Sequence, residues 1–420
     1  MTEPNAVSND DGRKLIPKLR FPGFEAGWLN EPLSKVLDEH KLKNDGGCEV
    51  FSVSLERGVV NQIEHLGRSF AAQDTSKYNR AKPYDIVYTK SPLRDFPYGI
   101  VKQCKVDTDV ALSPLYGVFS PTNRHLGLLI EAYFESPNRS KAFLAPLCQK
   151  GAKNTIQISN STFLSGRLPL PREKAEQQEI AECLSTLDDL IGAESQKLDA
   201  LNAHKRGLVQ QLLPRQGETI PRLRFPEFAD AAEWKEKPLE AVADYENGKA
   251  YEPHITQTGK YVVVNSRFIS TDGAIRKYSN ESLCIAKRGD VMMVLSDLPK
   301  GRALAKCYYA DVDNLYAVNQ RVCRLESHGI HSKFLHYLIN RHRWLLAYDD
   351  GMNQTHLSKD SVLQCPLNIP PTLEEQRKVA DLMTFLDDLI GAQIDKLDAL
   401  TTHKKGLLQQ LFPSPVEAEA

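Results

Sequence analysis

Two stretches of the chain place apolar residues at the alternating three- and four-residue spacing of a helix with one apolar face. Roughly 40 residues at about 1.5 Å each predict two rods about 60 Å long. The matched apolar positions are Ile180, Leu184, Leu187, Ile191, Leu198, Leu201, Leu208 and Leu212 in the first stretch, and Val379, Met383, Leu386, Ile390, Leu397, Leu400, Leu407 and Leu411 in the second.

Proline and a capping motif mark the ends of these helices. Pro214 and Pro413 follow the last apolar positions, and proline cannot continue a helix. The second helix opens with Thr372 and Glu375, a Thr-x-x-Glu capping box whose side chains bond free N–H groups of the first turn. We interpret the preceding Asn368-Ile-Pro-Pro segment as a strand-to-helix turn.

The two helices are copies of one sequence. Leu-Asp-Asp-Leu-Ile-Gly-Ala starts at Leu187 and again at Leu386, and 20 of the 28 positions from 187 to 214 are identical in the second copy. A shorter repeat, Leu-Arg-Phe-Pro followed by a tryptophan, starts at Leu19 and at Leu223. The chain is therefore two related halves. We interpret the aromatic clusters that open them as packing plugs, with a partner contact as the alternative.

Each half also contains a long segment of mixed pattern. Runs rich in β-branched and aromatic residues predict strands at 84–89, 117–119, 261–264 and 291–295, and a helical pattern covers 330–346. We predict an α+β fold in which two globular domains alternate with two long helices. The expected parts are a disordered tail (1–14), a first domain (15–166), a first helical repeat (167–214), a second domain with a short linker (215–365), a second helical repeat (366–413) and a tail (414–420).

A rod with a single apolar stripe needs a partner. One alternative is a coiled coil that joins separate molecules; the other is that the two copies pair with each other as an antiparallel coiled coil. Polar residues break the apolar stripe at Glu194 and Lys205 and at Gln393 and Lys404. Antiparallel pairing with Glu194 opposite Lys404 also places Lys205 opposite Gln393, and we expect this pair to fix the register rather than to add much stability.

Composition and charge narrow the class of protein. The 420 residues are 41% hydrophobic and 25% charged, without an apolar run long enough to cross a membrane, and the eight cysteines form no Cys-x-x-Cys pair, so we expect a cytoplasmic protein with reduced thiols. The net charge is only −1, but the distribution is uneven. Basic residues dominate segments 68–105 and 276–306, whereas acidic residues dominate 172–206. Two basic segments thus alternate with acidic helices.

Several motifs resemble one known family. They are Leu-Arg-Phe-Pro at each opening, Pro83-Tyr-Asp-Ile-Val and Gly289-Asp-Val, Glu-Gln at 176 and 375, and the ending Leu-x-Ala-Leu…Lys-x-Gly-Leu-x-Gln-Gln-Leu of each half. Together they resemble the specificity subunit of type I DNA restriction–modification systems, the HsdS family, over nearly the whole chain. The resemblance implies two target recognition domains that each read one half of a split, asymmetric DNA site. It also implies helices that set the gap and dock two modification subunits, with restriction subunits joining them.

The resemblance directs attention to two sets of residues. For phosphate and base contacts on double-stranded DNA, we select Lys77, Arg80, Lys90, Arg94, Tyr98 and Lys102 in the first domain and Asn265, Arg267, Ser296, Lys300, Arg302, Lys306, Asn319, Gln320 and Arg321 in the second. For the spacer and the subunit contacts we select Leu187, Ile191, Gly192, Glu194, Leu198, Leu201, Lys205, Gly207, Leu386, Ile390, Gly391, Gln393, Leu397, Leu400, Lys404 and Gly406. For any single DNA-contact residue, an ordinary solvated role is an equal alternative.

No catalytic motif is found in the chain. There is no phosphate-binding Gly-x-x-x-x-Gly-Lys-Ser/Thr loop, and the spacing of Cys323, His328, His331 and His336 fits no zinc pattern. We therefore expect no catalytic residue, metal or cofactor in this chain; the family implies S-adenosylmethionine in the modification subunits, and ATP with magnesium if a restriction subunit is present. The alternative function is a coiled-coil scaffold that binds RNA or an acidic partner.

Overall fold

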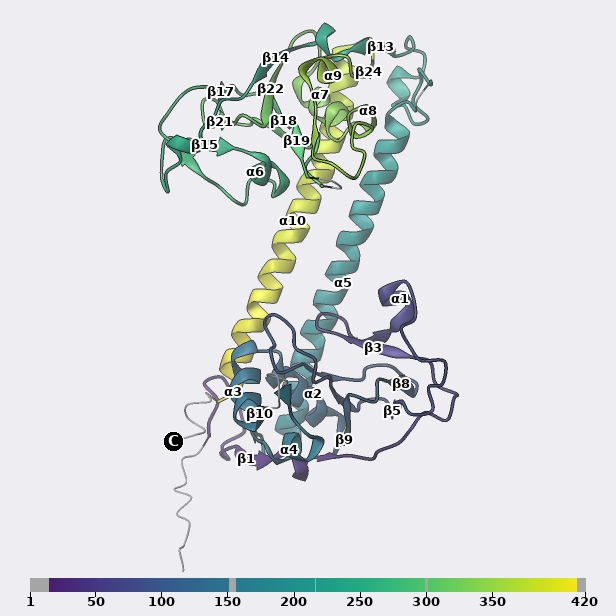
Figure 1. The fold of residues 1–420 in the computed structure, drawn as a ribbon, viewed down its shortest axis with the longest axis vertical. Helices are drawn as coiled ribbons and strands as arrows, with labels where there is room; N and C mark the ends of the chain where they lie inside the picture. The colour runs from purple at the N-terminus through teal and green to yellow at the C-terminus, as the bar shows by residue number, and fades with distance from the viewer. Residues whose placement is uncertain (1–14, 151–155, 216, 299–300, 414–420) are drawn as a thin grey trace, which may run out of the picture. The chain divides into compact units, whose positions relative to one another are not determined.

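The computed structural model describes residues 15–150, 156–215, 217–298 and 301–413 (Figure 1). It divides into two compact units: unit 1 contains residues 1–195 and 395–420, and unit 2 contains residues 196–394. The long helices α5 (Lys174–Leu212) and α10 (Leu373–Leu411) each begin in one unit and end in the other. Each unit therefore holds the beginning of one long helix and the end of the other.

The same four-stranded sheet occurs in both units. In unit 1 its order is β2 (Leu37–Asp38), β9 (Gly117–Pro121), β6 (Ile86–Tyr88) and β7 (Val101–Gln103). In unit 2 it is β14 (Ala243–Asn247), β22 (Val322–Ser327), β18 (Val291–Val294) and β20 (Cys307–Tyr309). All neighbouring strands are antiparallel. The predicted α+β fold and its internal repeat are confirmed.

Smaller sheets complete the units. Unit 1 has β1 (Leu29–Pro32) with β12 (Arg167–Leu170), β3 (Phe51–Ser54) with β4 (Gly58–Asn61), β5 (Asn79–Ala81) with β8 (Val110–Leu112), and β10 (Gln149–Lys150) with β11 (Ile156–Gln157). Unit 2 has β13 (Lys235–Pro238) with β24 (Pro366–Ile369), β19 (Ser296–Asp297) with β23 (Thr355–His356), and a four-stranded sheet of β16 (Tyr278–Ser279), β15 (Tyr261–Val264), β21 (Tyr316–Val318) and β17 (Ile285–Ala286). Strands β12 and β24 lie inside the expected helical repeats, so the helices themselves start later than 167 and 366.

Short helices pack beside the sheets. They are α1 (Gln62–Leu66), α2 (Arg124–Phe134), α3 (Pro137–Leu147) and α4 (Asn160–Ser165) in unit 1, and α6 (Ser266–Ser270), α7 (Ser332–Ile339), α8 (Arg343–Leu346) and α9 (Lys359–Leu363) in unit 2. Single 3₁₀ turns cover Leu33–Lys35, Pro226–Phe228, Leu239–Ala241 and Glu252–His254. The single helix expected over 330–346 is two helices, because Arg341 adopts a positive φ of 53° between α7 and α8.

The long helices belong to the cores of both units. Ile180 and Leu184 of α5 and Leu408 and Leu411 of α10 join one buried cluster in unit 1. In unit 2, Leu212 at the end of α5 joins Val379 and Met383 near the start of α10. The apolar ends of the rods are therefore covered by the globular domains, which is why a single apolar stripe suffices.

A buried glutamate ties each opening motif to its helix. Glu176 accepts hydrogen bonds from Arg20 Nε at 2.7 Å and from Trp28 Nε1 at 3.1 Å. In the second copy Glu375 accepts from Arg224 Nε at 2.8 Å and from Trp234 Nε1 at 3.0 Å. Both carboxylates are fully buried. The interpretation of these openings as packing plugs is confirmed.

The capping box is only half formed. Thr372 Oγ1 accepts a hydrogen bond from the backbone N–H of Glu375 at 3.3 Å, as predicted. The side chain of Glu375 does not return to the backbone of Thr372, because it accepts from Arg224 and Trp234 instead. The strand-to-helix turn before it is confirmed, since β24 ends at Ile369 and α10 begins at Leu373.

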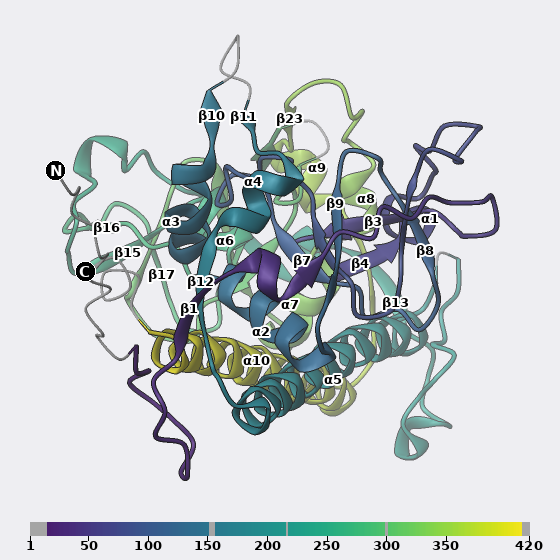
Figure 2. The same cartoon turned by 90° about the horizontal axis from the view of Figure 1, so that it is seen from below.

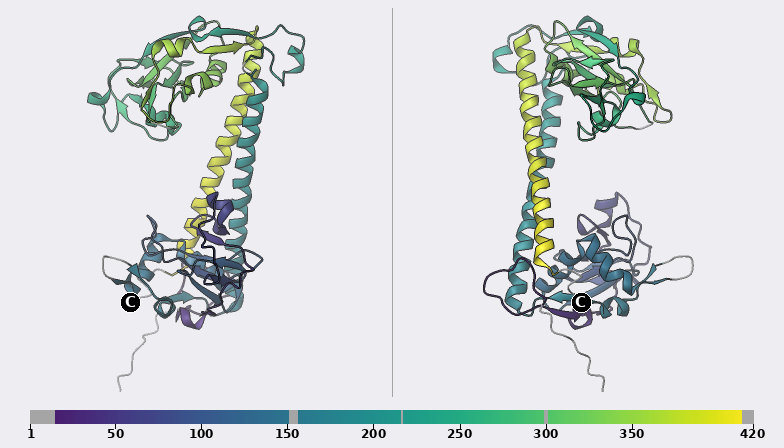
Figure 3. Two further views of the ribbon diagram at one scale, coloured as in Figure 1. Left: turned by 45° about the vertical axis from the view of Figure 1, so that its right-hand side comes forward. Right: turned by 90° about the vertical axis from the view of Figure 1, so that its left-hand side faces the viewer.

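The two long helices pair antiparallel, but in a different register from the expected one. They run side by side in Figures 2 and 3. In unit 1, Lys404 Nζ lies 2.5 Å from Asp188 Oδ1 and 2.7 Å from Glu135 Oε2. In unit 2, the equivalent Lys205 forms an ion pair with Asp387. Lys404 therefore faces Asp188 rather than Glu194, and Lys205 faces Asp387 rather than Gln393, a displacement of six residues in both copies.

The globular domains explain the displaced register. Glu135 follows α2 and Tyr337 lies on α7; Glu135 pairs with Lys404, and the Tyr337 hydroxyl donates to Asp387 Oδ2 at 2.8 Å. These side chains hold the lysine–aspartate pairs in place, and they are not visible to an argument from the two helices alone. Glu194 pairs instead with Lys396, with 2.5 Å between Oε1 and Nζ.

Candidate nucleic-acid interface

Equivalent hairpin loops carry seven of the fifteen selected polar residues. The loop between β6 and β7 in unit 1 corresponds to the loop between β18 and β20 in unit 2, because the two sheets share one strand order. In each loop a glycine lies against the beginning of the same loop. A Cβ atom on Gly99 would lie 2.8 Å from the Lys90 nitrogen, and one on Gly301 would lie 2.1 Å from Asp297 Oδ2. Gly99 and Gly301 therefore both allow a close approach within their loops.

In unit 1, four of the selected residues keep polar groups available at the surface. Lys77 and Arg94 are exposed, whereas Lys90 and Tyr98 are half-buried. Burial lowers the pKa of Lys90 from its ordinary value, although nearby Glu39 acts in the opposite direction. The Tyr98 hydroxyl belongs to this set, while its backbone carbonyl accepts from the Tyr88 hydroxyl at 2.7 Å.

The other two selected residues of unit 1 are paired with carboxylates. Arg80 Nε lies 2.6 Å from Asp109 Oδ2, and Asp45 lies near the same guanidinium. Lys102 is only 8% exposed, and its Nζ lies 3.5 Å from Glu131 Oε1. A phosphate contact by either side chain would require breaking an ion pair, so we leave both out of the proposed interface.

Three selected residues of unit 2 also have structural partners. Asn265 caps α6 by accepting from the Phe268 N–H at 2.9 Å. Asn319 is 5% exposed; its Oδ1 accepts from the Tyr251 and Gln320 N–H groups, and its Nδ2 donates to Glu252. Lys306 Nζ donates to Asp272 and to the Ser270 carbonyl. These groups hold the backbone in place and are not free to read bases.

Four other selected residues of unit 2 present free polar groups. Arg267, Arg302, Gln320 and Arg321 are exposed. None of the three arginines forms an ion pair with a carboxylate in the part of the chain that the structure describes. Lys300 lies outside the described residues. The exposed cations of this unit therefore remain available to phosphates.

A polar hollow of about 530 Å³ opens in unit 2. Its lining consists of Ser296, Gln320, Arg321, Gln354 and His356. Ser296 and His356 are directly paired across β19 and β23, and Gln354 Nε2 donates to Ser296 Oγ at 2.9 Å. Ser296, Gln320 and Arg321 are among the residues selected from the sequence, whereas Gln354 and His356 are not. The only signal for them was the glycine-containing turn at 349–353 before the strand.

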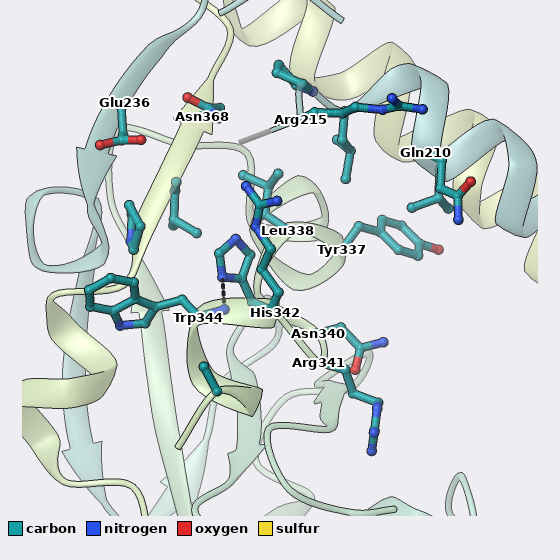
Figure 4. Close-up of a pocket in the computed structure, with 17 residues that line it drawn as sticks. Gln210, Arg215, Glu236, Tyr337, Leu338, Asn340, Arg341, His342, Trp344 and Asn368 are labelled. Carbon is teal, nitrogen blue, oxygen red and sulfur yellow. Dashed lines mark hydrogen bonds between the residues drawn. The ribbon is translucent and has the colours of Figure 1, made fainter. Parts of the chain in front are cut away.

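A second, larger pocket of about 960 Å³ lies where the end of α5 meets α7 and α8 (Figure 4). It is lined by Gln210, Arg215, Tyr337, His342 and Trp344, among others. Burial lowers the pKa of His342 to about 4, and the His342 ring accepts from the Trp344 N–H at 3.3 Å. At the end of α10 in unit 1, the Arg139 guanidinium instead donates to the Leu408 carbonyl at 2.6 Å and covers the Phe412 ring. The corresponding helix end in unit 1 is thus filled by the chain's own side chains.

The selected spacer residues occupy one partly covered stripe and one open face. The stripe residues, from Leu187 to Lys205 and from Leu386 to Lys404, are buried or half-buried. A Cβ atom on any of the four helix glycines, Gly192, Gly207, Gly391 and Gly406, would meet nothing within 4 Å. Leu190 and its repeat equivalent Leu389 are 42% and 39% exposed. No part of the chain that the structure describes therefore explains the repeated glycines by close packing.

The described residues form neither a metal site nor a membrane-spanning helix. No three histidine, cysteine, aspartate or glutamate side chains come together there as a metal site would require. Within the same part of the chain, every helix is too short or too polar to cross a membrane.

Comparisons with known proteins agree with the internal repeat. A family model described as type I restriction modification DNA specificity domain matches twice, over residues 39–203 and 231–401. The MjaVIII specificity subunit of a type I restriction enzyme from Methanocaldococcus jannaschii is 23% identical over 281 residues, which are 62% of this chain and 65% of that protein. The putative MjaX specificity subunit from the same organism is 22% identical over 290 residues, covering 64% of each. The chain thus matches slightly less than two thirds of the length of these relatives.

One solved structure has the same fold. The S subunit of a type I restriction-modification system from M. genitalium superimposes with a TM-score of 0.60 over 95% of this chain and 99% of that one. The sequence identity is 16%, so the likeness concerns the fold alone.

Proposed function

From the premise that this chain belongs to the family of type I restriction modification DNA specificity domains, we propose that it is the DNA-recognition subunit of a type I restriction–modification complex. Each globular domain reads one half of a bipartite, asymmetric DNA site. The helices that join the domains set the gap between the halves. The chain carries out no chemistry itself and acts in the cytoplasm, where the partner subunits supply adenine methylation with S-adenosylmethionine, and ATP-driven cleavage with magnesium when a restriction subunit is present.

One observation carries this proposal. Two sheets with one strand order present two hairpin loops at equivalent positions, and the loops differ in side chains. The first loop offers Arg94 and Tyr98, and the second offers Ser296 and Arg302. A repeated framework with different recognition groups suits a DNA site whose two halves have different sequences.

Repeated surface features support two copies of one partner. Leu190 and Leu389 are exposed at equivalent positions. Each long helix also has two glycines whose added Cβ atom would meet nothing within 4 Å, at positions equivalent in the two copies. Glycine in a helix interior costs about 1 kcal/mol relative to alanine, so its repetition suggests close approach by another backbone. We propose that these faces dock two modification subunits.

The test of recognition is methylation mapping. The chain is produced together with a type I modification subunit from its own host, and methylated adenines are mapped by sequencing the host DNA. We expect one motif with two unlike half-sites at a fixed gap. Methylation without such a motif, or purified protein that prefers RNA to duplex DNA, contradicts the proposal.

The test of docking uses the open glycines. Gly207→Leu together with Gly406→Leu adds bulk where a Cβ atom would meet no described atom within 4 Å. Assembly with the modification subunit should therefore weaken while the melting temperature is maintained. The matched pair Gly207→Ala and Gly406→Ala should keep assembly, because a single methyl group also favours the helix. Normal assembly of the leucine variant, measured by analytical ultracentrifugation, argues against this docking face.

A further inference from the structure

The polar hollow of unit 2 has one wall whose backbone is fixed from both sides. Gln320 and Arg321 form the turn between β21 and β22. Asn319 Oδ1 accepts from the Gln320 N–H at 2.8 Å, and the Arg321 carbonyl accepts from the Leu295 N–H at 2.9 Å. The two side chains themselves are exposed and bond to no other described residue. A fixed backbone with free side-chain groups is preorganised for a ligand.

The opposite wall is ordered by aspartates. Asp350 accepts from the N–H groups of Met352 and Asn353, and Asp349 accepts from Gly351 N–H and Thr355 Oγ1. These bonds hold the turn that leads into β23, where Gln354 and His356 face Ser296. Gln354 uses one amide N–H on Ser296 and keeps its carbonyl oxygen as an acceptor.

The chemistry of the hollow suits base edges. Its lining contains an arginine, two glutamines, a histidine and a serine, and no carboxylate. Arginine can donate two hydrogen bonds to the guanine O6 and N7 atoms, and glutamine can pair with adenine N6 and N7. Because the described lining has no acidic group, the positive charge of the Arg321 guanidinium is not neutralised within the hollow and can interact with DNA.

We propose that this hollow reads base pairs of the second half-site, with Arg321 contacting a guanine and Gln320 a neighbouring adenine. Ser296, Gln354 and His356 form the wall that orients these bases. The inference rests on the proposed DNA-recognition function and goes beyond it, since it assigns base reading to one turn and leaves the other exposed cations to phosphates.

The experiment compares methylation motifs. The complete complex with its modification subunit is prepared with Arg321→Ala and with Arg321→Gln, and methylated sites are mapped by sequencing. Losing a paired contact to guanine should reduce discrimination at one position of one half-site by roughly tenfold to a hundredfold, while the other half-site and the gap stay unchanged. Arg321→Gln should move the preference at that position from guanine towards adenine.

Arg288→Ala is the matched control. Arg288 is exposed in the turn between β17 and β18 of the same unit and does not line the hollow. Its substitution removes the same charge as Arg321→Ala. We expect its motif to equal that of the unaltered complex. An unaltered motif in both Arg321 variants overturns the inference, as does loss of discrimination in the Arg288 variant at the same position. Failure of the unaltered complex to yield any bipartite motif overturns the proposed function instead.

Discussion

At the scale of single residues, the buried glutamates Glu176 and Glu375 join the opening motif of each half to the first turn of a long helix. Each accepts from an arginine and a tryptophan of the opening motif and sits in the first turn of a long helix. Hydrogen bonding to Glu375 raises the pKa of Arg224, and Glu176 does the same for Arg20. The repeated Leu-Arg-Phe-Pro motif is therefore best understood as a structural latch.

Glu375→Gln tests this latch. The variant leaves Arg224, 8% exposed in its side chain, without an opposite charge, and breaking such a buried pair costs about 3 kcal/mol. Urea unfolding of the full chain should show this loss in the transition that reports unit 2. Glu374→Gln, which changes an exposed carboxylate one residue earlier, is the control. Equal stability of the two variants would show that the pair contributes nothing.

A second prediction at this scale concerns His336. Burial lowers its pKa to about 4, with an opposing effect of Asp387 and a further lowering by Lys333 and Lys205. The folded state keeps the ring neutral, while the unfolded chain binds a proton near pH 6.5 and below. The unfolded state therefore gains protons as the pH falls, and unit 2 should lose about 2 to 3 kcal/mol between pH 6.5 and 4.

The measurement for His336 is the free energy of unfolding as a function of pH. His336→Phe replaces the ring without losing a hydrogen bond of Nδ1, which has no partner among the described residues. This variant should flatten the pH dependence in that window, although His342, with a pKa also lowered to about 4 by burial, keeps part of it. An unchanged slope would contradict the assignment to His336.

At the scale of elements, the pairing of α5 with α10 depends on Lys205 and Lys404, the lysines that interrupt the apolar stripe of each helix. Lys404 is 12% exposed in its side chain and faces two carboxylates, whereas Lys396 is 50% exposed and faces one. Attraction to Glu135 and Asp188 raises the pKa of Lys404 against the opposing effect of burial. The lysine therefore sets the register by joining both helices to the domain.

Lys404→Met should destabilise unit 1 by about 2 kcal/mol, because two poorly solvated carboxylates lose their cation. Lys396→Met should cost no more than about 1 kcal/mol, as expected for an exposed pair. Thermal unfolding of the two variants at equal salt measures the difference. A larger loss for Lys396→Met would mean that the middle of the coiled coil, rather than the domain contact, fixes the register.

At the scale of the whole molecule, the internal repeat gives two units that share one strand order. The long helices exchange their ends, so each unit is completed by the start of one copy and the end of the other. Each long helix therefore extends through both units, and a change in its length affects both. In the proposed function it sets the gap between the half-sites.

Inserting seven residues after Ser195 and seven after Ile394 tests this role. One heptad keeps the apolar stripe and adds about 10 Å, which corresponds to about three base pairs of B-DNA. Methylation mapping should give both original half-sites with a gap longer by about that amount. Retention of the original gap by a stable variant would show that the helices do not set it.

The sequence by itself determined the two long helices and several of the strands, because their signals are local. Apolar spacing located both long helices. The runs at 84–89, 261–264 and 291–295 contain β6, β15 and β18, and the run at 117–119 covers the start of β9. The repeat predicted two copies of one half, and residue chemistry selected Gln320 and Arg321, which the structure leaves free.

Only the tertiary structure decided which side chains are already engaged. Arg80, Lys102, Lys306 and Asn319 have the right chemistry for DNA, but residues distant in sequence bind them. Asn265 is engaged locally, as the cap of α6. The helix register likewise depends on Glu135 and Tyr337 from the domains. Gln354 and His356 join the hollow only because β23 pairs with β19. Local patterns specify what a residue can do, whereas long-range contacts determine whether its polar groups remain unpaired.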